Sequence, residues 1–314
     1  MSGRVKARRT RVASILIAAL LALWVNPERL LAETKAMDYG EEPRFPAQAV
    51  LNAFHELWPQ RFSIPQFQDG DWQLCLDSTW YRWAGGRLLP LDFTGDQGLY
   101  SPWPFYSYPS ALAAVRKLSQ EERTRLESEL ARRDSSPPLR SPGLYDQLWD
   151  SPDEERAWDR MKTMRFLGKE VLVNPGIMEE LSAIERDLHA AARDDRATGA
   201  WIGSIVNVDG YLWRSVAGTS SRSFHSYGVA LDIMPSSARR NAWYWLDARK
   251  MGLRWFELPL AKRVQVPPVV VKIFEKYGFA WGGKWFFWDS VHFEYRPEIL
   301  LLNGMVPERQ ESLR

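Results

Sequence analysis

The chain has 314 residues, with 41 Lys plus Arg against 39 Asp plus Glu, so its formal net charge is +2. This balance excludes polyanion binding driven by bulk charge, and 45% hydrophobic with 25% charged residues is typical of globular proteins. The single cysteine, Cys75, excludes an internal disulfide framework and a multi-cysteine zinc site. Any metal site must therefore use His, Asp or Glu side chains.

The first 32 residues have the pattern of an export signal. Residues 1–11 are basic without an acidic residue, and the run 12–25 is apolar except for one serine. At 1.5 Å per residue the run spans about 21 Å, short of the ~30 Å hydrocarbon core of a membrane. We expect cleavage after Ala32 and a periplasmic or cell-envelope location, with an uncleaved membrane tether as the alternative. Residues 1–32 hold six basic groups and one acidic group, so the remainder carries a net charge of −3.

Residues 33–142 are predicted to form an aromatic-rich N-terminal accessory region. Apolar residues have helical spacing over 47–58, and short strand-like runs broken by Gly and Pro follow over 67–109. We expect a helix from Ser110.

Ser119 with Glu122 has the pattern of a capping box at a helix start. The segment 134–143 then breaks the helix, because four of its ten residues are Pro or Gly and three are Ser. It is the best internal boundary of the chain.

Residues 143–314 have a more regular pattern, which favours an α+β domain. We expect a helix after Ser151-Pro152, a strand over 170–173, and a helix after Asn174-Pro175. A further helix is expected over 268–277. The pattern also predicts a hairpin of strands 201–208 and 211–216 around an Asp-Gly turn, and an apolar helix face at Ile177, Leu181, Ile184 and Leu188.

Two short segments contain two of the four histidines beside acidic residues. The first contains His225 and Asp232, and the second contains Asp289 and His292. One straight strand would separate His225 and Asp232 by about 23 Å on opposite faces. A turn must therefore lie between them, and Gly228 can supply it.

Strand alternation predicts how the two segments meet. Beyond the turn, Ala230 and Asp232 face one side of a strand while their apolar neighbours face the other. In the second segment His292 and Glu294 alternate with apolar residues in the same way. Antiparallel pairing of the two strands would bring His292 to Asp232.

Two histidines and one carboxylate, with a fourth position left for water, form a catalytic zinc set. We therefore predict that His225, Asp232 and His292 bind Zn²⁺. Zinc lowers the pKa of its bound water to about 7 and polarises a carbonyl. Asp289, three residues before His292, is placed to take the water's proton and pass it to the leaving amine.

The pattern S-x-H-x6-D followed by D-x-x-H resembles the D-alanyl-D-alanine carboxypeptidase-like (VanY-type) zinc peptidases, relatives of the hedgehog-like metal fold. The resemblance covers residues 166–297 and includes AGTSSRSFHSYGVALDI and WGGKWFFWDSVHFE. It implies a small antiparallel sheet with flanking helices. It also implies zinc ligands at His225, Asp232 and His292, with Asp289 as the catalytic base.

The resemblance and the neighbouring residues suggest further members of the site. Arg214 falls where the family places an arginine that would hold a substrate carboxylate or the oxyanion; a salt bridge is the alternative. Ser223 and Trp285 are candidate substrate-binding residues. Glu294 would orient the ring of His292 by a hydrogen bond to the nitrogen that does not bind the metal. The alternative is that Glu294 is an exposed carboxylate on the strand.

We therefore expect an exported zinc metallopeptidase that hydrolyses peptidoglycan stem peptides. Dipeptidases and many carboxypeptidases of the group carry Glu where this chain has Asp289, whereas the phage-lysin-like L-alanyl-D-glutamate endopeptidases resemble it in using Asp. Which of these bonds is cut therefore stays open. The rival interpretation is a catalytically silent, zinc-stabilised cell-wall-binding or scaffold protein. Nucleic acid is not an expected partner, and the membrane is one only through an uncleaved N-terminal segment. His55 and His189 are predicted to be structural or solvated.

Overall fold

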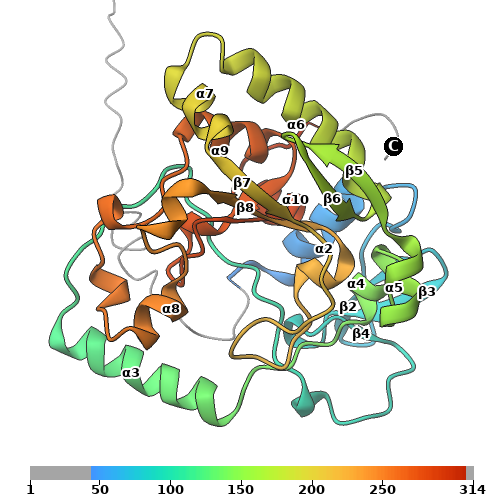
Figure 1. Cartoon of the computed structure of the whole chain (residues 1–314). Helices are drawn as coiled ribbons and strands as arrows, with labels where there is room; N and C mark the ends of the chain where they lie inside the picture. The colour runs from blue at the N-terminus through green and yellow to red at the C-terminus, as the bar shows by residue number, and fades with distance from the viewer. Residues whose placement is uncertain (1–43, 309–314) are drawn as a thin grey trace, which may run out of the picture. The chain divides into compact units, whose positions relative to one another are not determined.

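The computed structural model describes residues 44–308, which lie in one compact unit (Figure 1). It is a mixed α+β structure with small antiparallel sheets, as expected from the sequence. The predicted export signal, residues 1–32, lies outside the described residues. Within residues 44–308, the helices are too short or too polar to cross a membrane.

The N-terminal part combines two helices with one four-stranded sheet. The strands follow chain order, and each is antiparallel to the next. The predicted helix over 47–58 is confirmed, and Phe54 on its inner face contacts Phe62 and Phe105. The elements are α2 (Ala47–Leu57), β1 (Gln66–Gln68), β2 (Asp71–Leu76), β3 (Thr79–Arg82), β4 (Leu89–Pro90) and α3 (Gln120–Ser135).

Helix α3 begins later than the sequence pattern predicted. The helix expected from Ser110 starts at Gln120, directly after the capping box of Ser119 and Glu122, which is confirmed. The backbone carbonyl of Ser110 accepts a hydrogen bond from Lys284, so a tertiary contact uses a group that a helix would need. Residues 110–119 therefore form an irregular segment without helix or strand.

The chain beyond the Pro-rich segment begins with short helices and a hairpin. Asp153 caps α5 by accepting from the N–H of Arg156, which confirms the predicted helix start. The predicted strand over 170–173 lies in β6, and the predicted apolar face of α6 is buried. The elements are α4 (Gly143–Leu148), α5 (Glu154–Arg160), β5 (Lys162–Phe166), β6 (Lys169–Val173), α6 (Met178–Ala191) and α7 (Arg196–Gly203).

A second four-stranded antiparallel sheet lies at the centre of this part (Figure 1). Its apolar face packs on the predicted helix over 268–277, where Phe274 stacks on Phe293 at 4.1 Å. The opposite face is left for polar side chains. The sheet order is β7 (Ile205–Asp209), β8 (Ala230–Pro235), β10 (His292–Tyr295) and β9 (Phe279–Trp281), with helices α8 (Trp245–Lys250), α9 (Pro268–Lys276) and α10 (Pro297–Leu302) around it.

The hairpin predicted over 201–216 is wrong. Trp201 lies in α7, and β7 pairs with β8 instead of with residues 211–216. After Gly210 the chain runs against β6, where the N–H of Tyr211 donates to Leu172 O at 2.7 Å. The segment thus finds its backbone partners outside the expected hairpin, since every buried N–H and C=O needs one.

The hydrophobic core is continuous between the two parts of the chain. It joins Phe54 and Trp103 of the N-terminal part to Phe274 and Phe293 of the central sheet. Tyr145 at the start of α4 contacts Phe54, Trp103 and Phe224, so it links the two sides directly. Within the described residues, packing therefore does not separate 44–142 from 143–308, and the predicted domain boundary stays a prediction.

Candidate metal centre and active site

The pairing of β8 with β10 builds the candidate site. The two strands are antiparallel, and His292 lies directly opposite Asp232 in the register, as strand alternation predicted. His225 comes from the short 3-10 helix η4 (Phe224–Tyr227), which Gly228 ends with φ +68°. A Cβ at Gly228 would lie 2.2 Å from Met161 Sδ, so only glycine fits this turn.

Three side-chain atoms converge on one point between the strands. Asp232 Oδ1 lies 2.9 Å from His292 Nδ1 and 3.2 Å from His225 Nε2, and the two nitrogens are 3.2 Å apart. Tetrahedral Zn²⁺ with bonds of about 2.0–2.1 Å would hold neighbouring donors about 3.3 Å apart. The triangle therefore fits a small divalent ion after shifts of a few tenths of an ångström. Among residues 44–308, His225, Asp232 and His292 are the one group of three or more His, Cys, Asp or Glu side chains close enough together to hold a metal ion.

Local contacts fix the orientation of His225. Its Nδ1–H donates to the backbone oxygen of Gly210 at 2.5 Å, which leaves Nε2 for the ion. The hydroxyl of Ser223 is buried and accepts a hydrogen bond from the His225 N–H, so it holds the start of the turn. Its predicted role in substrate binding stays a prediction.

His292 is oriented by carboxylates on both ring nitrogens. Its Nε2 lies 3.4 Å from Glu294 Oε2, while Nδ1 faces Asp232. Burial lowers the pKa of His292, but hydrogen bonds to Asp232 and Glu294 outweigh it and raise the pKa to about 10. Burial raises the pKa of Asp232, yet the two histidines hold it well below its usual range. The cluster thus favours a cation between its groups.

Asp289 combines burial with an unpaired oxygen. Its Oδ1 is buried without a hydrogen-bond partner, although its backbone is fixed by the N–H bond to Gly282 O. Burial raises the pKa of this carboxyl to about 7; nearby His292 opposes the rise and Asp232 adds to it. A buried oxygen without a partner, on a carboxyl that titrates near neutrality, is suited to accept a proton from a bound water.

Arg214 lies near this carboxylate without being tied to it. Burial raises the pKa values of Asp289 and Tyr244, and the positive charge of Arg214 opposes both rises, which places the guanidinium close to both groups. Its side chain makes one long hydrogen bond, 3.4 Å, to Ser215 O, and no carboxylate of residues 44–308 forms an ion pair with it. The guanidinium therefore keeps donors for an anionic ligand.

Trp285 forms an aromatic wall beside the cluster. Its ring centroid lies 5.5 Å from that of His292 and 6.1 Å from that of Tyr106. Tyr106 and the carbonyl of Gly210 also belong to this surrounding shell, and sequence reasoning missed both. A backbone oxygen has no sequence signal, and Tyr106 lies 188 positions from its partner Glu294.

The two remaining histidines lie apart from this cluster. The Nδ1 of His55 lies 2.9 Å from Phe62 O, and His189 is an exposed residue at the end of α6 beside Glu185. Both arrangements agree with the prediction that these histidines are structural or solvated, His55 through its bond to Phe62 O and His189 through its exposure.

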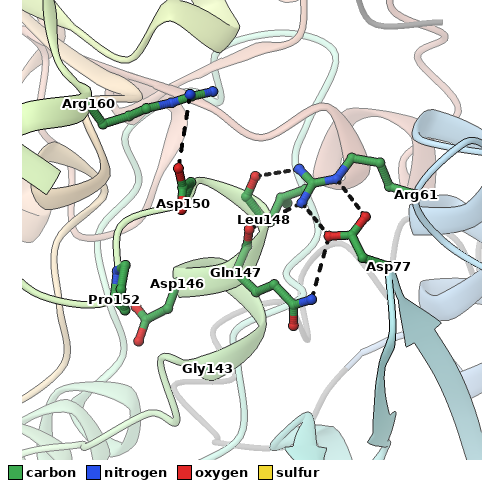
Figure 2. A pocket seen from close by; sticks show the side chains of 9 residues that line it. All are labelled: Arg61, Asp77, Gly143, Asp146, Gln147, Leu148, Asp150, Pro152 and Arg160. Carbon is green, nitrogen blue, oxygen red and sulfur yellow. Dashed lines mark hydrogen bonds and ion pairs between the residues drawn. The ribbon is translucent and has the colours of Figure 1, made fainter. Parts of the chain in front are cut away.

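A surface hollow near α4 is a separate feature, and Figure 2 shows the side chains that line it. Four of its charged groups pair with one another, Arg61 with Asp77 at 2.8 Å and Arg160 with Asp150 at 4.0 Å, and Asp146 pairs with Arg222. None of the three converging ligands lines it. The hollow therefore plays no part in the candidate metal centre.

Comparison with known families supports the peptidase interpretation over part of the chain. Residues 217–295 match the family model described as D-alanyl-D-alanine carboxypeptidase, and this stretch contains the three converging ligands and Asp289 but not Arg214. Residues 50–105 match a family model described as a domain of unknown function. No curated protein and no solved structure matches the chain. The hedgehog-like fold thus stays a prediction.

Proposed function

We propose that this chain is an exported, zinc-dependent peptidase that hydrolyses the stem peptides of peptidoglycan. One observation carries the proposal: His225, Asp232 and His292 converge within a match to the D-alanyl-D-alanine carboxypeptidase family, beside Asp289 with its unpaired oxygen. Three protein ligands from nitrogen and oxygen donors are the usual set for catalytic zinc. The N-terminal pattern of residues 1–32 supports export.

The chemistry divides among the residues of the site. A zinc ion bound there would lower the pKa of water and polarise the scissile carbonyl. Asp289 Oδ1 accepts the proton that the attacking water loses, and the carboxylic acid then donates it to the departing amine. Glu294 and the Gly210 carbonyl keep the two imidazole rings in the tautomers that point a nitrogen at the ion.

The free guanidinium of Arg214 supports an anionic substrate. A carboxylate on the peptide would pair with this guanidinium, because charge-assisted hydrogen bonds to Arg are strong and directional. Trp285 offers an apolar wall for the peptide's methyl groups. A terminal D-alanine and the carboxylate of D-glutamate both satisfy this arrangement, so the proposal covers D-alanyl-D-alanine and L-alanyl-D-glutamate bonds.

The test is hydrolysis of defined muropeptides by purified, zinc-loaded protein. Tri-, tetra- and pentapeptide substrates are incubated with the parent protein, and mass spectrometry identifies the bond that is cut. Asp289→Asn should retain zinc and lose about 10² to 10⁴-fold in turnover, because a neutral amide cannot accept the proton. Asp247→Asn, the same change on α8 at a residue paired with Lys250, is the matched control and should retain activity.

Two results would overturn the proposal. Zinc bound stoichiometrically with no product from any muropeptide would favour the silent cell-wall-binding alternative. Equal turnover by Asp289→Asn and the parent would remove the carboxylate from the reaction.

A further inference from the structure

The two oxygens of Glu294 serve different partners. Oε2 lies 3.4 Å from His292 Nε2, on the side of the metal centre. Oε1 accepts a hydrogen bond from the hydroxyl of Tyr106 at 3.3 Å and lies 3.5 Å from Arg296 Nη1. Because Glu294 is only 7% exposed, protein groups must satisfy both oxygens.

Arg296 alone fixes Glu294 poorly, because a second carboxylate competes for it. Arg296 Nε donates a short hydrogen bond to Glu298 Oε1, whereas Arg296 Nη1 lies 3.5 Å from Glu294 Oε1. Glu298 also accepts a hydrogen bond from Tyr145 at 2.9 Å. Without the Tyr106 hydroxyl, Glu294 Oε1 would keep only the long contact to Arg296. The carboxylate would then be free to turn toward the guanidinium and away from His292.

Tyr106 also contacts the second neighbour of His292. Its ring meets Trp285 edge to face, with centroids 6.1 Å apart and planes at 79°, and Trp285 in turn lies against His292. The Asn303 side chain fixes the Tyr106 backbone, because Nδ2 donates to Tyr106 O at 3.1 Å. Tyr106 is thus held in place at both its backbone and its ring.

The position of Tyr106 depends on the N-terminal sheet. The N–H of Trp103 donates to Gly86 O at 2.8 Å, in the loop between β3 and β4. Phe105 stacks on Trp83 at 5.9 Å, just after β3. Phe105 is the last residue of the match to the domain of unknown function. Tyr106 follows it directly, so the packing of that domain determines where Tyr106 lies.

We infer that Tyr106 is a positioning residue of the metal centre, by which the N-terminal region holds Glu294 against His292. The inference rests on the proposed metal site and goes beyond it. It assigns residues 50–105 to the assembly of the metal centre, in place of a separate binding function. Outer partners of metal-bound histidine set the ring's orientation and basicity, which gives Tyr106 an effect on metal affinity without touching the ion.

The experiment compares two Tyr→Phe variants of the full chain. Tyr106→Phe removes the hydroxyl on Glu294. Tyr108→Phe removes a hydroxyl from the same segment that bonds Glu275 at 2.6 Å and accepts from the Trp281 N–H, away from Glu294. Zinc affinity is measured by chelator competition, and the visible spectrum of the Co²⁺-loaded proteins reports the ligand geometry. Melting of the metal-free proteins shows that both fold.

Tyr106→Phe should weaken zinc binding about tenfold, the lower end of the range for outer partners of a ligand, and shift the Co²⁺ spectrum. Tyr108→Phe should leave affinity and spectrum unchanged. Glu294→Gln should weaken binding by about 10 to 100-fold, and adding Tyr106→Phe to it should cost nothing further, since Tyr106 acts through Glu294.

The outcomes separate this inference from the proposed function. A parent protein that binds neither zinc nor cobalt overturns the metal site itself. Metal binding in the parent that Tyr106→Phe leaves unchanged overturns the inference alone. Equal losses in the Tyr106→Phe and Tyr108→Phe variants also overturn it, because they mean that the segment acts only through folding.

Discussion

Metal binding at this site should displace a proton from His292. In the metal-free protein the pKa of His292 is raised to about 10, since its hydrogen bonds to Asp232 and Glu294 outweigh the effect of burial. At pH 7, about three units below that pKa, roughly one molecule in 10³ has a free Nδ1. Freeing this nitrogen for a metal then costs about 4 kcal/mol, at 1.36 kcal/mol per unit.

The metal-free protein holds this proton and the metal-bound protein does not, so raising the pH favours metal binding. Metal and proton compete for Nδ1, so His292 should contribute about a tenfold rise in apparent zinc affinity per pH unit between pH 8 and 9.5, beside the contribution of the zinc-bound water, whose pKa is lowered to about 7. Asp289, with a pKa of about 7, is ionised throughout this interval and adds no slope. Each bound zinc should release about two protons in this interval, one from His292 and one from the zinc-bound water.

Two measurements check this coupling. Chelator competition across the interval gives the slope, and titration calorimetry in buffers of different ionisation enthalpy counts the released protons. Glu294→Gln should lower the pKa of His292, because the negative charge that raises it is lost, and so should reduce the proton release; the smaller proton competition offsets part of the affinity that this variant loses at neutral pH. An affinity independent of pH, with no proton release in the parent, would refute the reasoning.

Three further predictions follow from the same geometry. Gly228→Ala should destabilise the fold by more than Gly218→Ala: both have positive φ, which costs about 1–2 kcal/mol for alanine, but only Gly228 would also collide with Met161 and Asn174. Denaturant unfolding measures the difference, and equal losses would mean that the turn has room. Arg214→Ala should lower kcat/KM for stem peptides far more than for carboxyl-amidated analogues; equal losses on both substrates would assign Arg214 to the fold or the oxyanion. A chelator should lower the melting temperature of the parent, and zinc should restore it, because zinc at 100 times its Kd stabilises the folded state by about 2.7 kcal/mol. A His225→Ala variant that responds equally would place the ion elsewhere.

Local sequence patterns predicted the centre of the candidate site. Alternation with period two defines the faces of β8 and β10, and a shift of one residue would bury Asp232 among apolar side chains. The pattern therefore predicted that His292 and Asp232 share a face once the two strands pair, and the observed register places them directly opposite each other. Gly228 indicated its turn because glycine alone adopts positive φ without cost.

Only the tertiary structure decided what surrounds this centre. The strand pattern of β7 did not reveal whether it pairs with the next segment or with β8, because alternation defines a face and not a partner. The Gly210 carbonyl bonds His225 from 15 positions away, and Tyr106 bonds Glu294 from 188 positions away, and no local period encodes such contacts. The sequence by itself thus determined which side chains can hold a metal, and folding decided which groups hold those side chains in place.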